Sequence, residues 1–262
     1  MNKEFAPNYE RDEKGRILFP EKDTILRYLH FTYTDSNEHV AKCNMYMIKE
    51  LVEYVSEPGE TILDPFAGTG TILIAATMGR KVICIEIEPL FQDIVESNIA
   101  AMGIKDSANL VRGDCSKILP VPGVANHAIF SPPWAQILRK KSVDSFGKDM
   151  GYGSATSYTN DPYNIGNLSD FLYHQKMEKV YRKLFDTLTP GGTLTIIIKD
   201  RSSGGERIKY GARARKDCLR IGYEPVSWHR WYVKGGGFAK YNRSVGIKTV
   251  DEEDLITLRK PV

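Results

Sequence analysis

The sequence of 262 residues has few cysteines and no long apolar run. Its longest apolar stretches, residues 82–87 and 194–198, have the length of β-strands, whereas a helix that spans a membrane needs about 20 apolar residues. Residues 1–16 are polar and carry charges of both signs, so they lack the apolar middle of a secretory signal. We therefore expect no membrane partner and a cytoplasmic location.

The cysteines and histidines do not form a metal-binding pattern. Cys43, Cys84, Cys115 and Cys218 are widely separated, and no two of them form a C-x-x-C pair. The five histidines are also scattered, and none lies beside a cysteine at metal-ligand spacing. The glycine-rich segments lack the G-x-G-x-x-G spacing of a nicotinamide-binding loop. We expect reduced thiols, no metal site and no nicotinamide-dependent activity.

Positive charge is concentrated near the C-terminus. The net charge of the chain is only +3, but residues 199–243 carry twelve Lys/Arg against four Asp/Glu, a net charge of +8 that leaves −5 for the rest. Aromatic residues such as Tyr210 and Trp228 are interleaved with these cations, a mixture that suits phosphate neutralisation and base stacking. The alternative is a solvated charged face. The candidate nucleic-acid contacts are Lys199, Arg201, Arg207, Lys209, Arg213 and Arg215.

Short apolar strands alternate with amphipathic helices along most of the chain. The patterns predict strands at 61–64, 81–87, 109–111, 127–130 and 193–198, and helices at 41–55, 71–78, 89–102, 168–188 and 213–221. We interpret residues 190–192 as a turn and the C-terminal segment as a hairpin that joins the same sheet. This alternation indicates a doubly wound α/β fold with a mostly parallel sheet.

The chain reads as one catalytic domain with two irregular parts. Residues 1–37 are expected to form an arm or cover, and residues 38–262 the domain itself. A Gly-, Ser- and Tyr-rich stretch at about 135–167 is expected to be an inserted substrate loop, because long loops in compact domains are commonly functional. No segment is long enough for a separate target-recognition domain.

The first chemical motif lies between a buried strand and a helix. Its glycines permit a sharp turn and a close approach of the backbone to a ligand, although a tight turn is the alternative reading. At the end of the next strand, the Glu86 carboxylate has the right chemistry to accept hydrogen bonds from ribose hydroxyls. The motif consists of Asp64, Pro65, Phe66, Ala67, Gly68, Thr69, Gly70 and Thr71.

The second motif, Ser131-Pro132-Pro133-Trp134, directly follows a predicted strand. Two prolines fix the backbone and leave carbonyl oxygens free to accept hydrogen bonds. If the parallel strands are arranged as predicted, both motifs lie at the carboxyl edge of the sheet. The alternative is a loop that packs its tryptophan against the core.

The first motif and Glu86 resemble motifs I and II of the S-adenosylmethionine-dependent DNA methyltransferases that modify base amino groups, and the second motif resembles a sequence of the same family. The resemblance implies a class I methyltransferase, Rossmann-like fold with a seven-stranded sheet and helices on both faces. It also implies that S-adenosylmethionine binds with its methionine part at residues 66–70, its ribose at Glu86 and its adenine amino group at Asp114. For Asp114, a carboxylate that merely ends a strand is the alternative. Serine at the first position of the second motif resembles the cytosine N4 enzymes, whereas aspartate or asparagine resembles the adenine N6 enzymes.

The second motif suits the chemistry of an exocyclic amine, whose lone pair is delocalised into the base. If the Ser131 hydroxyl and the Pro132 carbonyl accept the amine N–H groups, the nitrogen can aim its lone pair at the methyl group. Trp134 would stack on a base flipped out of any duplex. No metal is required. Because no cysteine follows a proline, the residues argue against ring-carbon methylation.

Recognition of the substrate must then come from loops, including Arg139, Lys140 and Lys141 in the 135–167 stretch. We favour cytosine N4 in DNA as the target. Cytosine N4 in a structured RNA, whose loops hold unpaired bases, is the first alternative, and adenine N6 in DNA is the next. A catalytically inactive nucleic-acid-binding module is the non-enzyme alternative.

Overall fold

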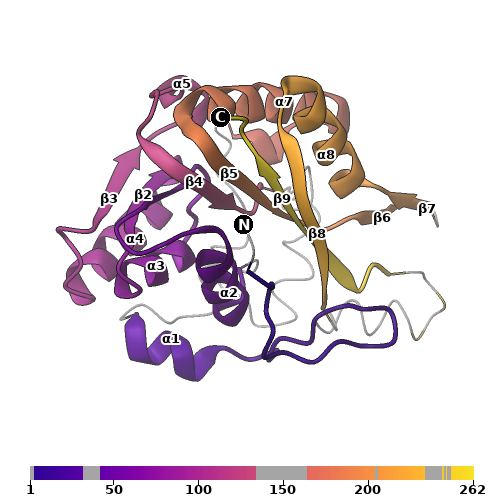
Figure 1. Ribbon diagram of the computed structural model, residues 1–262, viewed down its shortest axis with the longest axis horizontal. Coiled ribbons are helices and arrows are strands. Elements are labelled where there is room, and N and C mark those ends of the chain that lie inside the picture. Colours follow the sequence, from indigo (N-terminus) through magenta and orange to yellow (C-terminus); the bar gives the residue numbers. More distant parts are fainter. Residues whose placement is uncertain are drawn as a thin grey trace.

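A seven-stranded sheet in the order β3-β2-β1-β4-β5-β9-β8 organises the protein (Figure 1). The computed structural model describes residues 3–31, 42–133, 164–203, 206–233, 244, 246 and 249–262. Five strands are parallel neighbours: β3 (Ala108–Arg112), β2 (Lys81–Glu86), β1 (Thr61–Asp64), β4 (Ala125–Phe130) and β5 (Leu188–Ile198). Two antiparallel strands complete the sheet: β9 (Glu252–Arg259) and β8 (Glu224–Tyr232). The predicted doubly wound, mostly parallel fold is confirmed.

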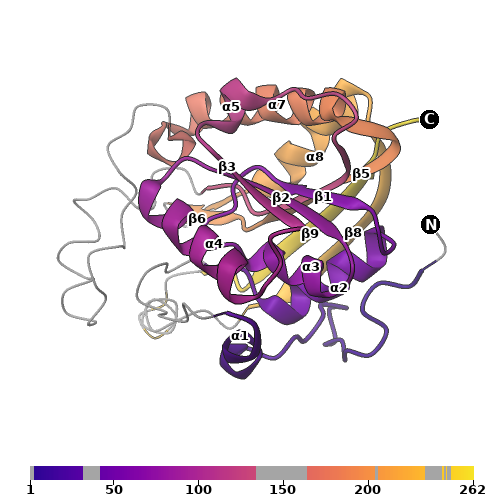
Figure 2. The same cartoon turned by 90° about the vertical axis from the view of Figure 1, so that its left-hand side faces the viewer.

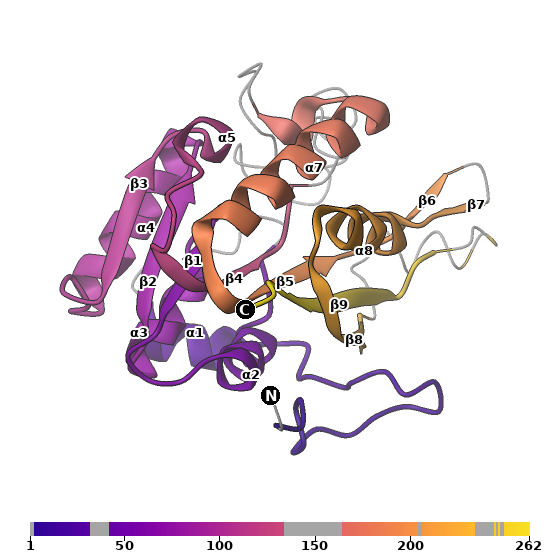
Figure 3. The same ribbon diagram turned by 45° about the horizontal axis from the view of Figure 1, so that its top comes forward.

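Helices cover both faces of the sheet (Figures 2 and 3). Adjacent residues of a strand point to opposite faces, so Ile62 packs into one hydrophobic core and Leu63 into the other. The first core contains side chains of α2 (Met45–Val55), α3 (Ile74–Thr77) and α4 (Pro89–Ala101). The second contains those of α5 (Cys115–Ile118), α7 (Asp170–Thr187) and α8 (Tyr210–Ile221).

The predicted helices are present, and their ends follow local chemistry. Helix α2 begins four residues later than expected because Asn44 is its N-cap, with its side chain accepting a hydrogen bond from the Met47 N–H at 3.2 Å. The single helix expected at 71–78 is instead a 3-10 turn, η1 (Thr71–Leu73), followed by α3. Helix α8 ends at Ile221 and is followed by the C-cap Gly222, whose φ of 119° is a left-handed conformation that favours glycine.

The turn expected at residues 190–192 lies inside strand β5, so that prediction is wrong. Ala125 pairs with Leu188 and His127 with Thr193, so four residues of β5 oppose only one of β4. A Cβ atom on Gly192 would lie 2.3 Å from the Asn126 carbonyl oxygen. The strands can therefore remain paired around this irregularity only with glycine at 192.

The N-terminal segment is more ordered than the sequence indicated. Ile17 bridges β8 in parallel: its N–H donates to the Arg230 carbonyl at 2.8 Å, and its own carbonyl accepts from the Tyr232 N–H at 3.0 Å. Phe5 and Phe19 are buried in the first core. This segment covers part of the edge strand, which otherwise exposes unpaired backbone groups. Other elements that the sequence patterns did not predict are α1 (Thr24–His30), the α5 turn, η3 (Ile165–Asn167), and the two-stranded ribbon of β6 (Arg201–Ser203) and β7 (Glu206–Ile208).

Candidate active site

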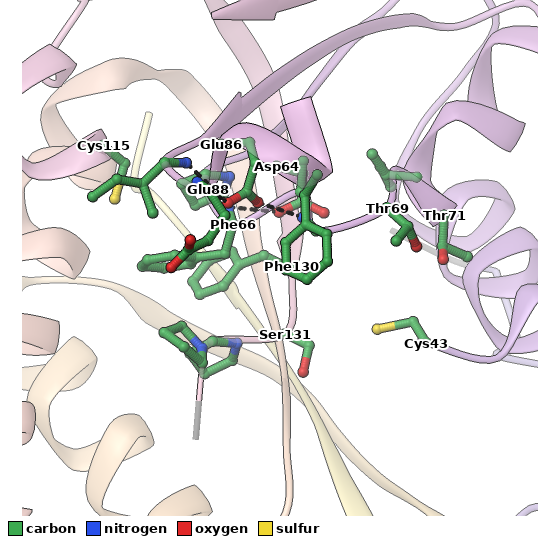
Figure 4. Close-up of a pocket in the computed structure, with 18 of the residues that line it drawn as sticks. Cys43, Asp64, Phe66, Thr69, Thr71, Glu86, Glu88, Cys115, Phe130 and Ser131 are labelled. Carbon is green, nitrogen blue, oxygen red and sulfur yellow. Dashed lines mark hydrogen bonds between the residues drawn. The ribbon is translucent and has the colours of Figure 1, made fainter. Parts of the chain in front are cut away.

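A pocket opens at the carboxyl ends of β1, β2, β3 and β4, where the two sequence motifs meet (Figure 4). Parallel strands place their carboxyl ends at one edge, which is why segments about 60 residues apart converge. The sequence-predicted residues that line it are Asp64, Pro65, Phe66, Ala67, Gly68, Thr69, Thr71, Glu86, Asp114, Ser131, Pro132 and Pro133. Trp134 lies outside the described residues.

Two left-handed glycines shape the loop after β1. Gly68 has a φ of 54° and Gly70 a φ of 81°, conformations that other residues adopt only with strain. A Cβ on Gly70 would lie 3.0 Å from Leu73 Cδ1 and 3.1 Å from Val95 Cγ2. Gly70 is not among the lining residues of the pocket, and its position shows that it serves the close packing of η1 against α4.

Glu86 ties this loop to the end of β2. One carboxylate oxygen accepts the Gly68 N–H at 2.6 Å, and the other accepts the N–H groups of Ile87 at 2.9 Å and Glu88 at 2.8 Å. The side chain is buried, and this desolvation raises the pKa of Glu86 to about 7 although the three hydrogen bonds oppose the shift. Glu86 thus holds the backbone of the loop, and one lone pair, on the oxygen that accepts from Gly68, is left for a ribose hydroxyl.

Asp64 is a second buried carboxyl group in the pocket. It accepts the Phe66 N–H at 2.9 Å, which closes the turn out of β1. Desolvation raises the pKa of Asp64 to about 8; the hydrogen bond from Phe66 opposes this shift and the nearby Glu86 adds to it. Without a ligand, the pocket therefore holds two carboxyl groups that titrate near neutral pH.

Asp114 lies two residues after the end of β3, at Arg112, and directly before α5. It is the N-cap of α5, with one oxygen accepting the Ser116 N–H and the other the Ser116 hydroxyl, both at 2.8 Å. The Asp114 carboxylate therefore has a local structural role, and the residue also lines the pocket. A contact to an adenine amino group remains a prediction.

The Ser131 side chain lies on the other side of the pocket from the glycine loop. Figure 4 shows the sulfur of Cys43 pointing toward Ser131. Desolvation raises the pKa of the Cys43 thiol, and the carboxylates of Glu253 and Asp64 add to this, so the thiol stays protonated at neutral pH. Cys43 is therefore not a thiolate nucleophile.

The sequence patterns did not indicate several of the residues that line the pocket. Glu88 and Phe91 follow Glu86 closely, and this proximity could have indicated them. Asn164 is buried and donates a hydrogen bond to Glu88, which joins the start of η3 to α4. It comes directly after a stretch without periodicity, so no local signal pointed to it.

Most of the basic residues predicted to contact nucleic acid in the C-terminal third have interaction partners within the protein. Arg201 pairs with Asp170 at 2.7 Å, Arg207 with Asp200 at 2.7 Å, and Arg213 with Asp217 at 3.0 Å. Lys199 also has an interaction partner, whereas Lys209, the N-cap residue of α8, is exposed and makes no side-chain capping hydrogen bond. Arg215 differs, because its guanidinium lies 5.8 Å from the ring of Trp228, which is 40% exposed. Arg139, Lys140 and Lys141 lie outside the described residues.

Two further findings concern the described part of the chain. Within it, no group of three or more His, Cys, Asp or Glu side chains is arranged to hold a metal ion. None of the helices described is both long enough and apolar enough to cross a membrane.

Comparison with known families decides the class of protein. A DNA methylase family model matches residues 5–97, and a model described as an RMKL-like methyltransferase domain matches residues 55–188, just over half of the chain. The chain belongs to the family of RMKL-like methyltransferase domains, and its N-terminal third is also similar to the DNA methylases. This methyltransferase is therefore S-adenosylmethionine-dependent, as predicted. The matching methylase model covers both N6 and N4 enzymes, so it does not choose between them.

Individual relatives match shorter stretches of the methyltransferase. YubD of Escherichia coli, described as a methylase, is 30% identical over 90 residues, which cover 34% of this chain and 39% of that protein. The type II methyltransferase M.MthZI of Methanothermobacter thermautotrophicus is 46% identical over 50 residues, 19% of this chain and 14% of that protein. The methyltransferase thus matches less than half the length of these relatives.

Solved structures share its fold. A geranyl diphosphate methyltransferase in complex with S-adenosylmethionine has a TM-score of 0.56 at 10% identity, covering 82% of this chain and 85% of its own. TrmN from Thermus thermophilus has a TM-score of 0.52 at 17% identity, covering 83% of this chain and 49% of its own. The class I methyltransferase fold expected from the motifs is confirmed.

Proposed function

We propose that this methyltransferase transfers a methyl group to the exocyclic amino group of a nucleic-acid base, with cytosine N4 in DNA as the target. The observation that carries the proposal is that Ser131-Pro132-Pro133 line the same pocket as the glycine loop after β1. Bound S-adenosylmethionine would supply an activated, positively charged sulfonium methyl group.

The residues of the pocket fit such a cofactor. The carboxyl groups of Asp64, Glu86 and Glu88 line it, and ionised carboxylates attract a cation. Ile87 and Phe91 supply apolar surface beside them, as a purine ring requires. The left-handed Gly68 allows the backbone to approach a ligand closely.

On the substrate side, Ser131 and Pro132 have the acceptors that an amine needs. The Ser131 hydroxyl and the Pro132 carbonyl would accept the two N–H groups, so that the nitrogen lone pair is directed at the methyl group. After transfer, the amine proton leaves to solvent. Trp134, the next residue, would stack on the base. Serine in the first position of this motif supports the cytosine N4 assignment over adenine N6.

The assay that tests the proposal uses the full chain with methyl-labelled cofactor and separate pools of duplex DNA, single-stranded DNA and RNA. Digestion to nucleosides then locates the label. We expect N4-methyldeoxycytidine from DNA, formed at least about a hundredfold more slowly with Ser131→Ala.

Other outcomes identify the alternatives. Label in N4-methylcytidine from RNA would establish the RNA target, which the small size of the predicted reading loops favours. Label in N6-methyldeoxyadenosine would establish adenine methylation. Cofactor binding without label in any pool would contradict catalysis and favour a binding module.

A further inference from the structure

Arg27 connects helix α1 to the cofactor pocket. Its guanidinium donates a hydrogen bond to the Thr71 hydroxyl at 3.3 Å and another to the Cys43 carbonyl oxygen at 2.5 Å. Thr71 begins η1, directly after the glycine loop, whereas Cys43 precedes α2. Both residues line the pocket. Arg27 therefore joins two separate segments of the pocket wall from behind.

Arg27 is held in this orientation by Asp23. The Arg27 Nε donates to Asp23 Oδ1 at 3.0 Å, and Nη2 lies 2.9 Å from Asp23 Oδ2. The same Oδ2 accepts the N–H of Met45, the first residue of α2, at 2.8 Å. Only 11% of the Arg27 side chain is exposed, so solvent competes little for these contacts. A two-pronged guanidinium–carboxylate contact of this kind defines direction as well as distance.

Apolar packing of α1 is limited to Leu26, which is partly buried against the first hydrophobic core. None of its residues is buried, and Ile25, Tyr28 and Leu29 are exposed by 77%, 69% and 72%. The polar contacts of Arg27 and Asp23, with a hydrogen bond from Asn44 Nδ2 to the Pro20 carbonyl at 2.7 Å, attach this part of the chain. The loss of Arg27 should therefore release the wall of the pocket without opening the hydrophobic core.

We propose that Arg27 is a positioning residue for methyl transfer: it fixes the segment that carries Cys43 against Thr71 and so sets the shape of the cofactor pocket. Figure 4 shows Cys43 and Thr71 on one side of the pocket and Ser131 across from Cys43. The part of this proposal that concerns methyl transfer rests on the proposed function, in which Ser131 is the amine acceptor. Its effect on cofactor binding is independent of the nucleic-acid target.

The test measures S-adenosylmethionine binding by calorimetry on the full chain. Arg27→Met keeps the aliphatic stem but removes every donor, and we expect the dissociation constant to rise about tenfold because the wall is no longer pre-organised. Arg27→Lys retains a cation but cannot span both acceptors, so it should give an intermediate rise. In the methylation assay the KM for nucleic acid should change less than about twofold, since Arg27 lies behind the wall.

Arg11→Met is the matched control. Arg11 lies in the same N-terminal segment, and its side chain donates to the Phe5 carbonyl at 3.0 Å rather than to any of the pocket-lining residues that the structure describes. The Arg11→Met variant should bind S-adenosylmethionine with the same dissociation constant as the native chain. Asp23→Asn keeps an acceptor for Met45 while removing the ion pair, and should raise the dissociation constant in the same direction as Arg27→Met.

The proposal is overturned if Arg27→Met melts like the native chain and binds the cofactor equally well, or if Arg11→Met weakens binding as much. Should Arg27→Met fail to fold, native affinity in both Arg27→Lys and Asp23→Asn would overturn it. Weaker cofactor binding in an enzyme that labels no nucleic acid would support Arg27 while removing the proposed function.

Discussion

The Glu86 carboxylate accepts the backbone N–H of Gly68 at 2.6 Å and so connects the end of β2 to the glycine loop that follows β1. A residue expected to bind ribose therefore also shapes the loop expected to bind the methionine part. The two halves of the cofactor pocket depend on one buried side chain.

Glu86→Gln should lower both the stability of the protein and its affinity for the cofactor. Both carboxylate oxygens accept backbone N–H groups, so the amide NH2 of glutamine must face a donor wherever it points. We expect a destabilisation of about 1–3 kcal/mol in urea unfolding and an S-adenosylmethionine dissociation constant at least about tenfold higher. Glu57→Gln, at a carboxylate that is 66% exposed, is the control and should leave the urea midpoint almost unchanged. Equal stability of Glu86→Gln and the native chain would contradict the role of Glu86.

Ser131→Ala tests the acceptor role at the substrate side. We expect the rate constant for methyl transfer to fall about 10²- to 10³-fold, since one oriented acceptor is lost, while the cofactor dissociation constant stays within about twofold. Single-turnover transfer and calorimetry provide the two measurements. Ser227→Ala is a suitable control, because the buried Ser227 hydroxyl has no hydrogen-bond partner among the described residues. A Ser131→Ala enzyme of native rate would remove Ser131 from the reaction.

Cofactor affinity should depend on pH. The pKa of Asp64 is raised to about 8 and that of Glu86 to about 7, chiefly by burial, so both groups lose protons between pH 6 and pH 9. A cationic cofactor favours the ionised pocket, so the dissociation constant should fall as pH rises, by up to about tenfold per pH unit for each proton released. The neutral thioether product should show a weaker dependence. Calorimetry from pH 6 to 9 measures both, and a flat profile would show that these groups do not titrate in this range.

Stability without the cofactor should change in the opposite sense. The folded-state pKa values of these carboxyl groups exceed their unfolded values, so the folded chain holds protons that the unfolded chain has lost. Their contribution is complete at low pH and disappears as pH rises through about 7 and 8. Asp64→Asn, which keeps an oxygen for the Phe66 N–H, should flatten the decline of the melting temperature between pH 5 and 8.5. A decline of native steepness in this variant would assign the effect to other groups.

Nucleic-acid binding should depend on Arg215 more than on Arg213. Arg215 lies over the ring of Trp228, whereas Arg213 pairs with the buried Asp217. Arg215→Ala should weaken binding several-fold and reduce the slope of the salt dependence by about one. Arg213→Ala should instead lower the melting temperature, because Asp217 loses a partner. Fluorescence anisotropy over a salt series measures nucleic-acid binding by both variants. A larger loss of binding with Arg213→Ala than with Arg215→Ala would contradict the role of Arg215 in binding.

Sequence patterns predicted the structure best where one chemical requirement acts over a few consecutive residues. Strand β1, the glycine loop and the strand before Ser131 were all predictable, because buried parallel strands are short apolar runs and sharp turns require glycine. The ends of α2 and the course of β5 were less predictable. Asn44 capping and the opposition of Gly192 to Asn126 depend on contacts with particular partners.

The sequence by itself determined the fold class, the cofactor and the edge of the sheet at which both motifs lie, because right-handed crossovers bring the carboxyl ends of parallel strands together. Only the tertiary structure decided which charges are engaged inside the molecule. Arg207 pairs with Glu252 across 45 residues of chain, and Arg27 reaches Thr71 across 44. A count of basic residues records charge, whereas availability to a partner depends on which carboxylates and carbonyl groups folding brings alongside.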